Sequence, residues 1–443
     1  MQLNTITGIK MAYSIKCPTD TATINTLLSI LVKEKPVNMG ESKEKVYGLT
    51  KDDQSNLRIP FALSRMLWNI PLPDYTQLPR KQFACNIVLG HDGKDFQIPL
   101  YAQMVKSMLE TRTAYMALAC SSGKTMLAIK FAAELGVKAA IVTDATLIFP
   151  QWVKVIKECT NMKVAEIKSP LDKLPEADFY VFMITAAGKM HPSVLKDIHL
   201  LICDEALYLL TPTRIPALLN FSPFYSLGAC AEYKREDGMH AFLPLFWGSN
   251  MIKRISDTPF TVYRVETPYK PTVQYQRRTG KVDWNLVLES IAENEERNMD
   301  IVALCRSLPD SKIIIGCKRV EQATTLHNKF LELGESSALL VRNAKKFPQC
   351  RILVGIYSKM GKGVDVKNLC PDWEGDVFDV AILAADICNP EQFVGRVFRH
   401  KNPVIYHLVD DYSTFRKHFE RDCQPWYISR QGTINKMALA RAV

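Results

Sequence analysis

The chain has 443 residues, which is too long for one ordinary hydrophobic core and favours two to four domains. Hydrophobic residues make up 47% and charged residues 23%, as in water-soluble globular proteins, and no uncharged apolar run reaches the roughly 18 residues of a membrane span. The formal net charge of +10 suits a polyanionic partner, although many proteins carry such an excess without binding nucleic acid.

Residues 1–95 are mixed in composition, with a lysine-rich polar stretch from Lys33 to Lys51, and are expected to form a small N-terminal accessory domain. No basic region followed by an apolar stretch opens the chain, so we expect no secretory signal. The 12 cysteines are scattered without a CxxC pair, which argues against a zinc site or a disulfide framework. A reducing intracellular compartment is therefore the expected location.

From residue 96 to 266, short apolar runs alternate with helical periodicity. The expected strands are Tyr115–Ala119, Ala139–Thr143, Phe179–Ile184, Leu200–Cys203 and Ser226–Ala229. Helices are expected between them, including Thr125–Leu135, which stops at Gly136, and Phe149–Glu158. This alternation predicts an α/β domain with a parallel sheet covered on both faces.

Residues 267–299 include a polar, proline-containing stretch, which we interpret as a linker to a second α/β unit at 300–420. There the expected elements are strands Lys312–Cys317, Arg351–Ile356, Val377–Ala384 and Val404–Val409, and helices Val320–Leu333 and Pro390–His400. The basic and aromatic end of the chain, from Arg416, is expected to pack as a helical tail, with residues 421–443 outside the second domain.

A candidate phosphate-binding loop lies between an expected strand and an expected helix. It consists of Cys120, Ser121, Ser122, Gly123, Lys124 and Thr125. Backbone N–H groups would face the phosphates, Lys124 would neutralise the β and γ oxygens, and the Thr125 hydroxyl would ligate Mg²⁺. The full pattern GxxxxGK[ST] requires glycine where this chain has Leu118, so the loop departs from it.

Two adjacent carboxylates follow about 80 residues after the loop, at the end of an expected strand. Asp204 would bind Mg²⁺, and Glu205 would act as the base that orients the attacking water. A solvated acidic pair at a strand end is the alternative interpretation. The distance from the phosphate loop favours the catalytic one.

Gln392, Arg396 and Arg399 recur at i, i+4 and i+7 and would share one face of a helix. Two arginines delivered by a second domain could reach a γ-phosphate as arginine fingers. An ordinary basic surface helix is the alternative. It does not explain Gly395, which would cost ~1 kcal/mol relative to alanine inside a helix.

At these residues the chain resembles the superfamily 2 helicases, and most of all the DNA-dependent ATPase branch represented by the poxvirus transcript-release helicase. The likeness is collinear over about residues 98–431. Tyr101 and Gln103 stand where the family has its tyrosine–glutamine pair ahead of the loop. The other matching segments are 120–125 (motif I), 139–152 (Ia), 178–190 (Ic), 204–207 (II), 227–248 (III), 312–319 (IV), 355–366 (V) and 392–399 (VI).

The resemblance implies two tandem RecA-like domains that hydrolyse ATP, with Mg²⁺, in the cleft between them and move along nucleic acid. It adds Gln103, Gly363 and Asp365 to the expected nucleotide-binding residues. It also implies nucleic-acid contacts at Gln151, Lys189 and Lys359. DNA is favoured over RNA, transcription or replication proteins are the expected partners, and a viral protein would act in the host cytoplasm or the virion, with the nucleus left open.

One departure concerns motif III, where the family has Ser-Ala-Thr and this chain has Cys230, Ala231 and Glu232. A carboxylate there would weaken unwinding more than hydrolysis. Three functions stay open: an active ATPase that translocates or unwinds, a helicase-like binding or assembly subunit with lost turnover, and another two-domain P-loop ATPase that acts on proteins. The presence of the whole set Lys124, Thr125, Asp204, Glu205, Gln392, Arg396 and Arg399 favours the first.

Overall fold

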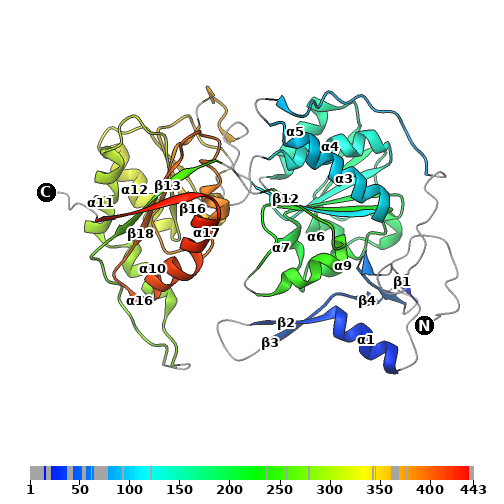
Figure 1. Cartoon of the computed structure of the whole chain (residues 1–443), viewed down its shortest axis with the longest axis horizontal. Helices are drawn as coiled ribbons and strands as arrows, with labels where there is room; N and C mark the ends of the chain where they lie inside the picture. Colours follow the sequence, from blue (N-terminus) through cyan, green and yellow to red (C-terminus); the bar gives the residue numbers. More distant parts are fainter. Residues whose placement is uncertain are drawn as a thin grey trace. The chain divides into compact units, whose positions relative to one another are not determined.

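The computed structural model describes residues 14–15, 21–36, 43–51, 56–60, 62–63, 78–91, 94–119, 122–146, 148–235, 237–254, 258–277, 280–341, 344, 346–360, 369–375 and 377–438. The chain divides into two compact units, Met1–Arg254 and Ile255–Val443 (Figure 1). None of the helices in these ranges is both long and apolar enough to span a membrane.

Unit 1 contains a seven-stranded parallel sheet in the order β12-β6-β11-β10-β7-β9-β8. Its strands are β6 (Thr113–Leu118), β7 (Ala139–Thr143), β8 (Val164–Ile167), β9 (Phe179–Met183), β10 (Leu200–Asp204), β11 (Tyr225–Cys230) and β12 (Met251–Arg254). All five strands expected from the sequence are confirmed. The two missed strands, β8 and β12, are short edge strands, and β12 ends in two cations that mask its apolar character.

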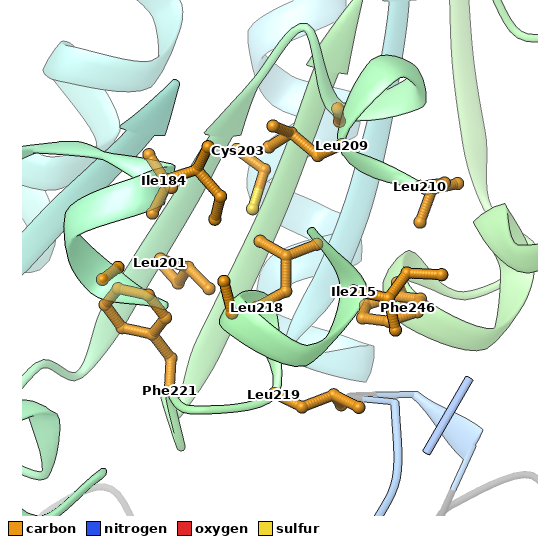
Figure 2. Packing of buried hydrophobic residues seen from close by; sticks show 14 of the residues in the cluster. Ile184, Leu201, Cys203, Leu209, Leu210, Ile215, Leu218, Leu219, Phe221 and Phe246 are labelled. Atoms are coloured by element: carbon orange, nitrogen blue, oxygen red, sulfur yellow. The ribbon is translucent and has the colours of Figure 1, made fainter. Parts of the chain in front are cut away.

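Helices cover both faces of this sheet, as the continuous apolar strands predicted. One face packs against α3 (Gln97–Thr111), α4 (Lys124–Leu135) and α5 (Ile148–Cys159). The other packs against shorter helices, α6 (Ile184–Ala187), α7 (Ala206–Leu209), α8 (Ile215–Leu218) and α9 (Leu243–Trp247). Figure 2 shows Leu201 and Cys203 of β10 facing Leu218 and Phe221 in this second layer.

The structure places no domain boundary at residue 95. Helix α1 (Thr21–Leu31) and the hairpin β2 (Val32–Pro36) with β3 (Lys43–Tyr47) bury Leu31 and Val46 in the same core cluster as Phe242. Short strands β1 (Ser14–Ile15), β4 (Thr50–Lys51) and β5 (Leu57–Arg58) form a separate small sheet. The described parts of the expected accessory domain therefore belong to unit 1.

Unit 2 contains a second seven-stranded parallel sheet in the order β15-β16-β14-β17-β18-β13-β19. Its strands are β13 (Phe260–Glu266), β14 (Ile313–Cys317), β15 (Ser337–Leu340), β16 (Ile352–Ile356), β17 (Val380–Leu383), β18 (Val404–Val409) and β19 (Gly432–Ala438). Helix α12 (Val320–Glu332) confirms the helix expected at 320–333. Two tandem α/β units with parallel sheets are confirmed.

The boundary expected at residues 266/267 is corrected by β13. This strand pairs with β18, some 140 residues later, so it belongs to unit 2 and the division falls after Arg254. The expected linker 267–299 contains α10 (Trp284–Ala292) and the start of α11 (Glu295–Arg306), capped by Asp283 and Asn294. Sequence periodicity could not reveal this, because a strand's partners are set by long-range pairing.

The tail is helical only in part. It consists of α16 (Ser413–His418), a π-helical turn η4 (Phe419–Cys423) and α17 (Gln424–Ser429), and it ends in β19. Strand β19 adds to the sheet beside β13, so residues 432–438 lie inside the second domain rather than beyond it.

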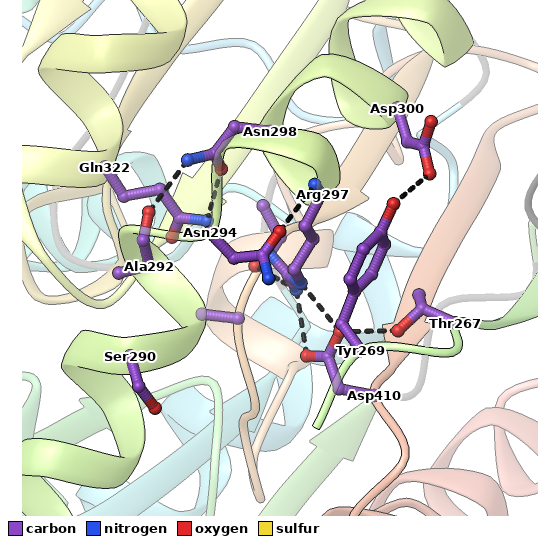
Figure 3. A network of polar contacts seen from close by, with 12 residues as sticks. Thr267, Tyr269, Ser290, Ala292, Asn294, Arg297, Asn298, Asp300, Gln322 and Asp410 are labelled. Carbon is purple, nitrogen blue, oxygen red and sulfur yellow. Dashed lines mark hydrogen bonds and ion pairs between the residues drawn. The ribbon is translucent and has the colours of Figure 1, made fainter. Parts of the chain in front are cut away.

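A buried polar network ties α11 to the ends of β13 and β18 (Figure 3). The fully buried Arg297 guanidinium donates to both carboxylate oxygens of Asp410, at 2.6 and 3.0 Å, and to the Ala384 carbonyl. The Thr267 hydroxyl donates to the same carboxylate. Removing one partner would leave a buried charge unpaired, which typically costs ~3–5 kcal/mol.

Candidate nucleotide and nucleic-acid sites

The described part of the phosphate loop, Ser122 to Thr125, opens helix α4 at the carboxyl end of β6. Gly123 precedes the helix with φ +88°, and a Cβ there would lie 2.4 Å from the side-chain nitrogen of Gln97. The left-handed backbone conformation favours glycine at this position. The N-terminus of the 12-residue α4 provides backbone N–H groups and a favourable dipole for phosphate. Cys120 and Ser121 lie outside the described residues.

Lys124 and Thr125 stand in the first turn of α4, and both are half-buried. The Lys124 Nζ donates to the carbonyl of Leu118, the last residue of β6, at 2.8 Å. Leu118, which stands where the full pattern has glycine, thus contacts Lys124 through its backbone carbonyl. Any residue at position 118 could make this contact. This hydrogen-bond acceptor is a neutral carbonyl group.

Two residues that sequence reasoning missed hold the loop. Gln97, a buried residue of α3, donates its side-chain amide to the Ser122 carbonyl at 3.2 Å. Arg254, at the end of β12, donates to the Ser122 hydroxyl at 3.4 Å, and its guanidinium lies 3.5 Å from the centroid of the Phe96 ring. Gln103, which the resemblance indicated, is exposed on α3. A single glutamine or arginine carries no sequence signal for such a contact.

The two carboxylates lie where the sequence predicted them, at the carboxyl end of β10. Asp204 is buried; its Oδ2 accepts from the Trp152 indole N–H at 2.8 Å, and its Oδ1 accepts from the Glu205 N–H at 3.0 Å. Burial raises the pKa of Asp204 to about 6, the charge of Glu205 adds to that rise, and the Trp152 bond opposes it.

The residues at this edge fit the Mg²⁺ that the resemblance implies. Asp204 is a buried carboxylate whose described hydrogen-bond donors are both neutral, and a divalent cation would compensate its charge. No cluster of three or more His, Cys, Asp or Glu side chains occurs in the described residues, as a site ligated by protein alone would require. Mg²⁺ commonly binds one or two protein ligands together with nucleotide phosphates and waters.

One of the residues that depart from motif III, Cys230, contacts the second carboxylate, Glu205. The Cys230 thiol, at the end of β11, donates to Glu205 Oε2 at 3.2 Å. Burial raises the pKa of Cys230 well above its usual value, so the thiol keeps its proton. The buried Glu232 carboxylate accepts from the Tyr208 hydroxyl at 2.6 Å, and the Tyr115 hydroxyl donates to the Glu232 carbonyl. Both substituted residues are hydrogen-bonded in place.

In unit 2 the expected helix 390–400 is short. Helix α15 (Glu391–Val394) ends at Gly395, and i→i+3 backbone bonds follow at Arg396 and Val397. Gly395 caps the helix instead of standing inside it, so the argument drawn from its cost was wrong, and no single helical face carries all three expected residues. Gln392 is half-buried, Arg399 is exposed, and the Arg396 Nε donates to the Met360 carbonyl.

The expected nucleic-acid residues follow strands of the two sheets. Gln151 is half-buried on α5 and Lys189 is exposed just after α6, which directly follows β9. Lys359 is half-buried on α13 (Tyr357–Met360), which directly follows β16 of unit 2. Gly363 and Asp365 lie outside the described residues. Each unit thus carries candidates near the carboxyl edge of its own sheet.

The chain is similar in sequence to several known proteins. The family described as type III restriction enzyme, res subunit, matches residues 91–232. "Putative helicase 161L" of Invertebrate iridescent virus 6 is 27% identical over 402 residues, covering 84% of this chain and 88% of the relative. "Putative helicase 055L" of Frog virus 3 is 28% identical over 345 residues, covering 74% and 75%.

A solved structure shares the fold at low sequence identity. S. cerevisiae Dbp5 bound to RNA and ADP BeF3 is similar with a TM-score of 0.51 and 11% identity, covering 77% of this chain and 89% of the neighbour. The two parallel sheets are those of tandem RecA-like domains.

Proposed function

We propose that this chain is a superfamily 2-like helicase, that is, an ATP-driven nucleic-acid translocase or helicase. Its similarity to the type III restriction enzyme family and to two viral proteins described as putative helicases supports this. The observation that carries the proposal is the pair Asp204 and Glu205 at the end of β10. That edge of the sheet also holds the phosphate loop, which follows β6.

The residues divide the work of hydrolysis. The N-terminus of α4 and Lys124 bind the phosphates, while Thr125 and Asp204 would hold Mg²⁺, which when bound neutralises phosphate charge. Glu205 accepts a proton from the water that attacks the γ-phosphorus. The Cys230 thiol bonds to one oxygen of Glu205 and so fixes the orientation of the other. Gln392, Arg396 and Arg399 of unit 2 are proposed to stabilise the charge that develops on the transferring phosphoryl group.

We further propose that the chain moves along DNA and belongs to the DNA-dependent ATPases of the transcript-release branch. We also propose that it acts in viral transcription or replication, inside the host cell or virion. Support comes from the collinear motifs and the net charge of +10. Contacts to the phosphate backbone at Gln151, Lys189 and Lys359 would make affinity fall with salt and depend little on sequence.

The second candidate is a helicase-like binding subunit with weak or lost turnover. The observation in its favour is the carboxylate Glu232 in place of the hydroxyl residue of motif III. Against it, Lys124, Asp204 and Glu205 are all present, and each is held by a described hydrogen bond.

The deciding experiment measures steady-state ATP hydrolysis with double-stranded DNA, single-stranded DNA and RNA. We expect Mg²⁺-dependent turnover that DNA stimulates more than RNA, and its loss in Lys124→Ala. The matched control is Lys130→Ala on the same helix, whose ammonium pairs with Glu134 away from the loop. A wild-type chain that binds nucleic acid without turnover would establish the binding subunit instead.

A further inference from the structure

Trp152 joins helix α5 to the catalytic edge of unit 1. Its ring is buried in the core between α5 and the sheet, with 1% of its surface exposed. The indole N–H makes a polar contact in this apolar surrounding: it donates to Asp204 Oδ2 at 2.8 Å. A buried indole N–H usually has a hydrogen-bond partner, and a backbone carbonyl would serve as well as a carboxylate.

The bond restricts the Asp204 carboxylate. Oδ1 accepts from the Glu205 backbone N–H and Oδ2 from the indole, so one donor holds each oxygen. Two donors on opposite oxygens fix the plane of the carboxylate and leave its remaining lone pairs in defined directions. Without the indole N–H, Oδ2 would have no described donor, and the carboxylate could rotate about its terminal torsion, which is intrinsically soft.

Another tryptophan among the described residues of unit 1 provides the contrast. Trp247 is also fully buried, in the opposite core layer, where its ring lies 5.8 Å from that of Tyr115. Its indole nitrogen has no hydrogen-bond partner within the described residues. Burial alone therefore does not bring an indole N–H against a carboxylate in this fold.

We infer that Trp152 is a positioning residue for ATP hydrolysis, which acts by orienting Asp204 toward the metal–nucleotide complex. The inference rests on the proposed function. Residues that orient metal ligands commonly change metal affinity or activity by about 10–100-fold when they are replaced. A phenylalanine at position 152 keeps an aromatic ring in the core and removes the donor.

The experiment compares Trp152→Phe with Trp247→Phe in the full chain. Binding of a fluorescent ATP analogue is titrated with MgCl₂, and turnover is measured in parallel. In Trp152→Phe we expect about tenfold more Mg²⁺ for half-maximal binding and a kcat lower by about 10–100-fold, with metal-free nucleotide binding unchanged. Trp247→Phe should match wild type in both readouts.

Two further arms separate positioning from folding. Adding Trp152→Phe to Asp204→Asn should cause no further change in Mg²⁺ dependence, because the indole acts through that carboxylate. If Trp152→Phe does not fold, benzothienylalanine at position 152 replaces only the N–H with sulfur and should give the same Mg²⁺ shift. If a folded variant at position 152 had the same Mg²⁺ dependence as the wild-type protein, the inference would be overturned. Hydrolysis by the wild-type protein would still support the proposed function. Absence of hydrolysis in wild type would instead overturn the proposed function.

Discussion

Glu205 has a backbone conformation that few side chains adopt. Its φ is +51°, and only Arg112 and Gln431 share a positive value among the described non-glycine residues. This region costs a residue with a Cβ of order 1 kcal/mol or more and persists where the surroundings impose it. Here the turn directs the Glu205 N–H to Asp204 Oδ1 and the side chain to the Cys230 thiol. The strained backbone conformation is thus found at the residue proposed as the catalytic base, Glu205.

Glu205→Gln should therefore still bind ATP and hydrolyse it at least ~10³-fold more slowly, because Asp204 and the phosphate loop are untouched while the base is lost. Nucleotide affinity and steady-state turnover check this. The control is Glu166→Gln, an exposed carboxylate paired with Lys168. Nucleotide affinity that collapses together with turnover would give Glu205 a structural role.

A second residue-scale prediction concerns His407 on β18. It is buried, its Nδ1 lies 2.9 Å from the Tyr427 hydroxyl, and burial, with the nearby Arg264, lowers its pKa from 6.5 to about 3. Between these pH values the unfolded chain binds a proton that the folded chain excludes. The free energy of unfolding should therefore fall as the pH falls below about 6.5, by at most ~1.4 kcal/mol per pH unit from this group.

Chemical denaturation of the full chain at pH 7.5, 6 and 5 measures this contribution. His407→Gln removes the titration and keeps a hydrogen-bonding partner for Tyr427, so its stability should decline less steeply than that of wild type. His400→Gln, which replaces another histidine of unit 2, is the control and should retain the wild-type slope. Equal slopes for all three proteins would mean that His407 does not resist protonation.

At the scale of elements, β13 depends on the end of the chain. It is paired on one side by β18 and on the other, over seven residues, by β19. The Phe260 ring lies 6.1 Å from that of Tyr427, on helix α17, which precedes β19 in the chain. Without β19, a buried strand would become a sheet edge with unpaired backbone groups.

Truncation after Gln431 should consequently destabilise unit 2 by at least ~2 kcal/mol, since apolar surface on β13 would be exposed. For a unit of this size each kcal/mol shifts the unfolding midpoint by roughly 2–4 °C. Calorimetry of the full-length chain and of a control truncated after Ala438, which keeps β19, gives the comparison. Equal midpoints for the two truncated chains would show that β19 adds no stability.

At the scale of the whole molecule, the residues proposed for hydrolysis are divided between two separately folded sheets. The phosphate loop and the carboxylates belong to unit 1, and Gln392, Arg396 and Arg399 belong to unit 2. If the unit 2 residues act on the transferring phosphoryl group, replacing them should lower the rate of hydrolysis and leave nucleotide affinity nearly unchanged.

Arg399→Ala should cost about 10³-fold in turnover, as arginine fingers do, and leave nucleotide affinity nearly unchanged. The measurement is an ATPase titration with and without nucleic acid, beside fluorescent-nucleotide binding. Lys401→Ala, another exposed cation two residues away, is the matched control. A silent Arg399→Ala would mean that motif VI here describes a fold without this chemistry.

The sequence alone determined the central strands of both sheets and the placement of the phosphate loop and of Asp204 and Glu205. These features are local: continuous apolar runs give buried parallel strands, and polar residues that directly follow such a run stand at its carboxyl end. The same locality explains why Gly123 and Gly136 were placed correctly at the two ends of α4.

Only the tertiary structure decided the rest. Strands β13 and β19 pair in one sheet although they lie some 170 residues apart in the chain. Three side chains also contact the site from elements whose own patterns indicate only a buried helix face or a sheet edge: Trp152, Gln97 and Arg254. The segment around Gln392, Arg396 and Arg399 forms a shorter helix than its periodicity predicted. Pairing partners and side-chain contacts depend on residues distant in the chain, and local periodicity contains no information about them.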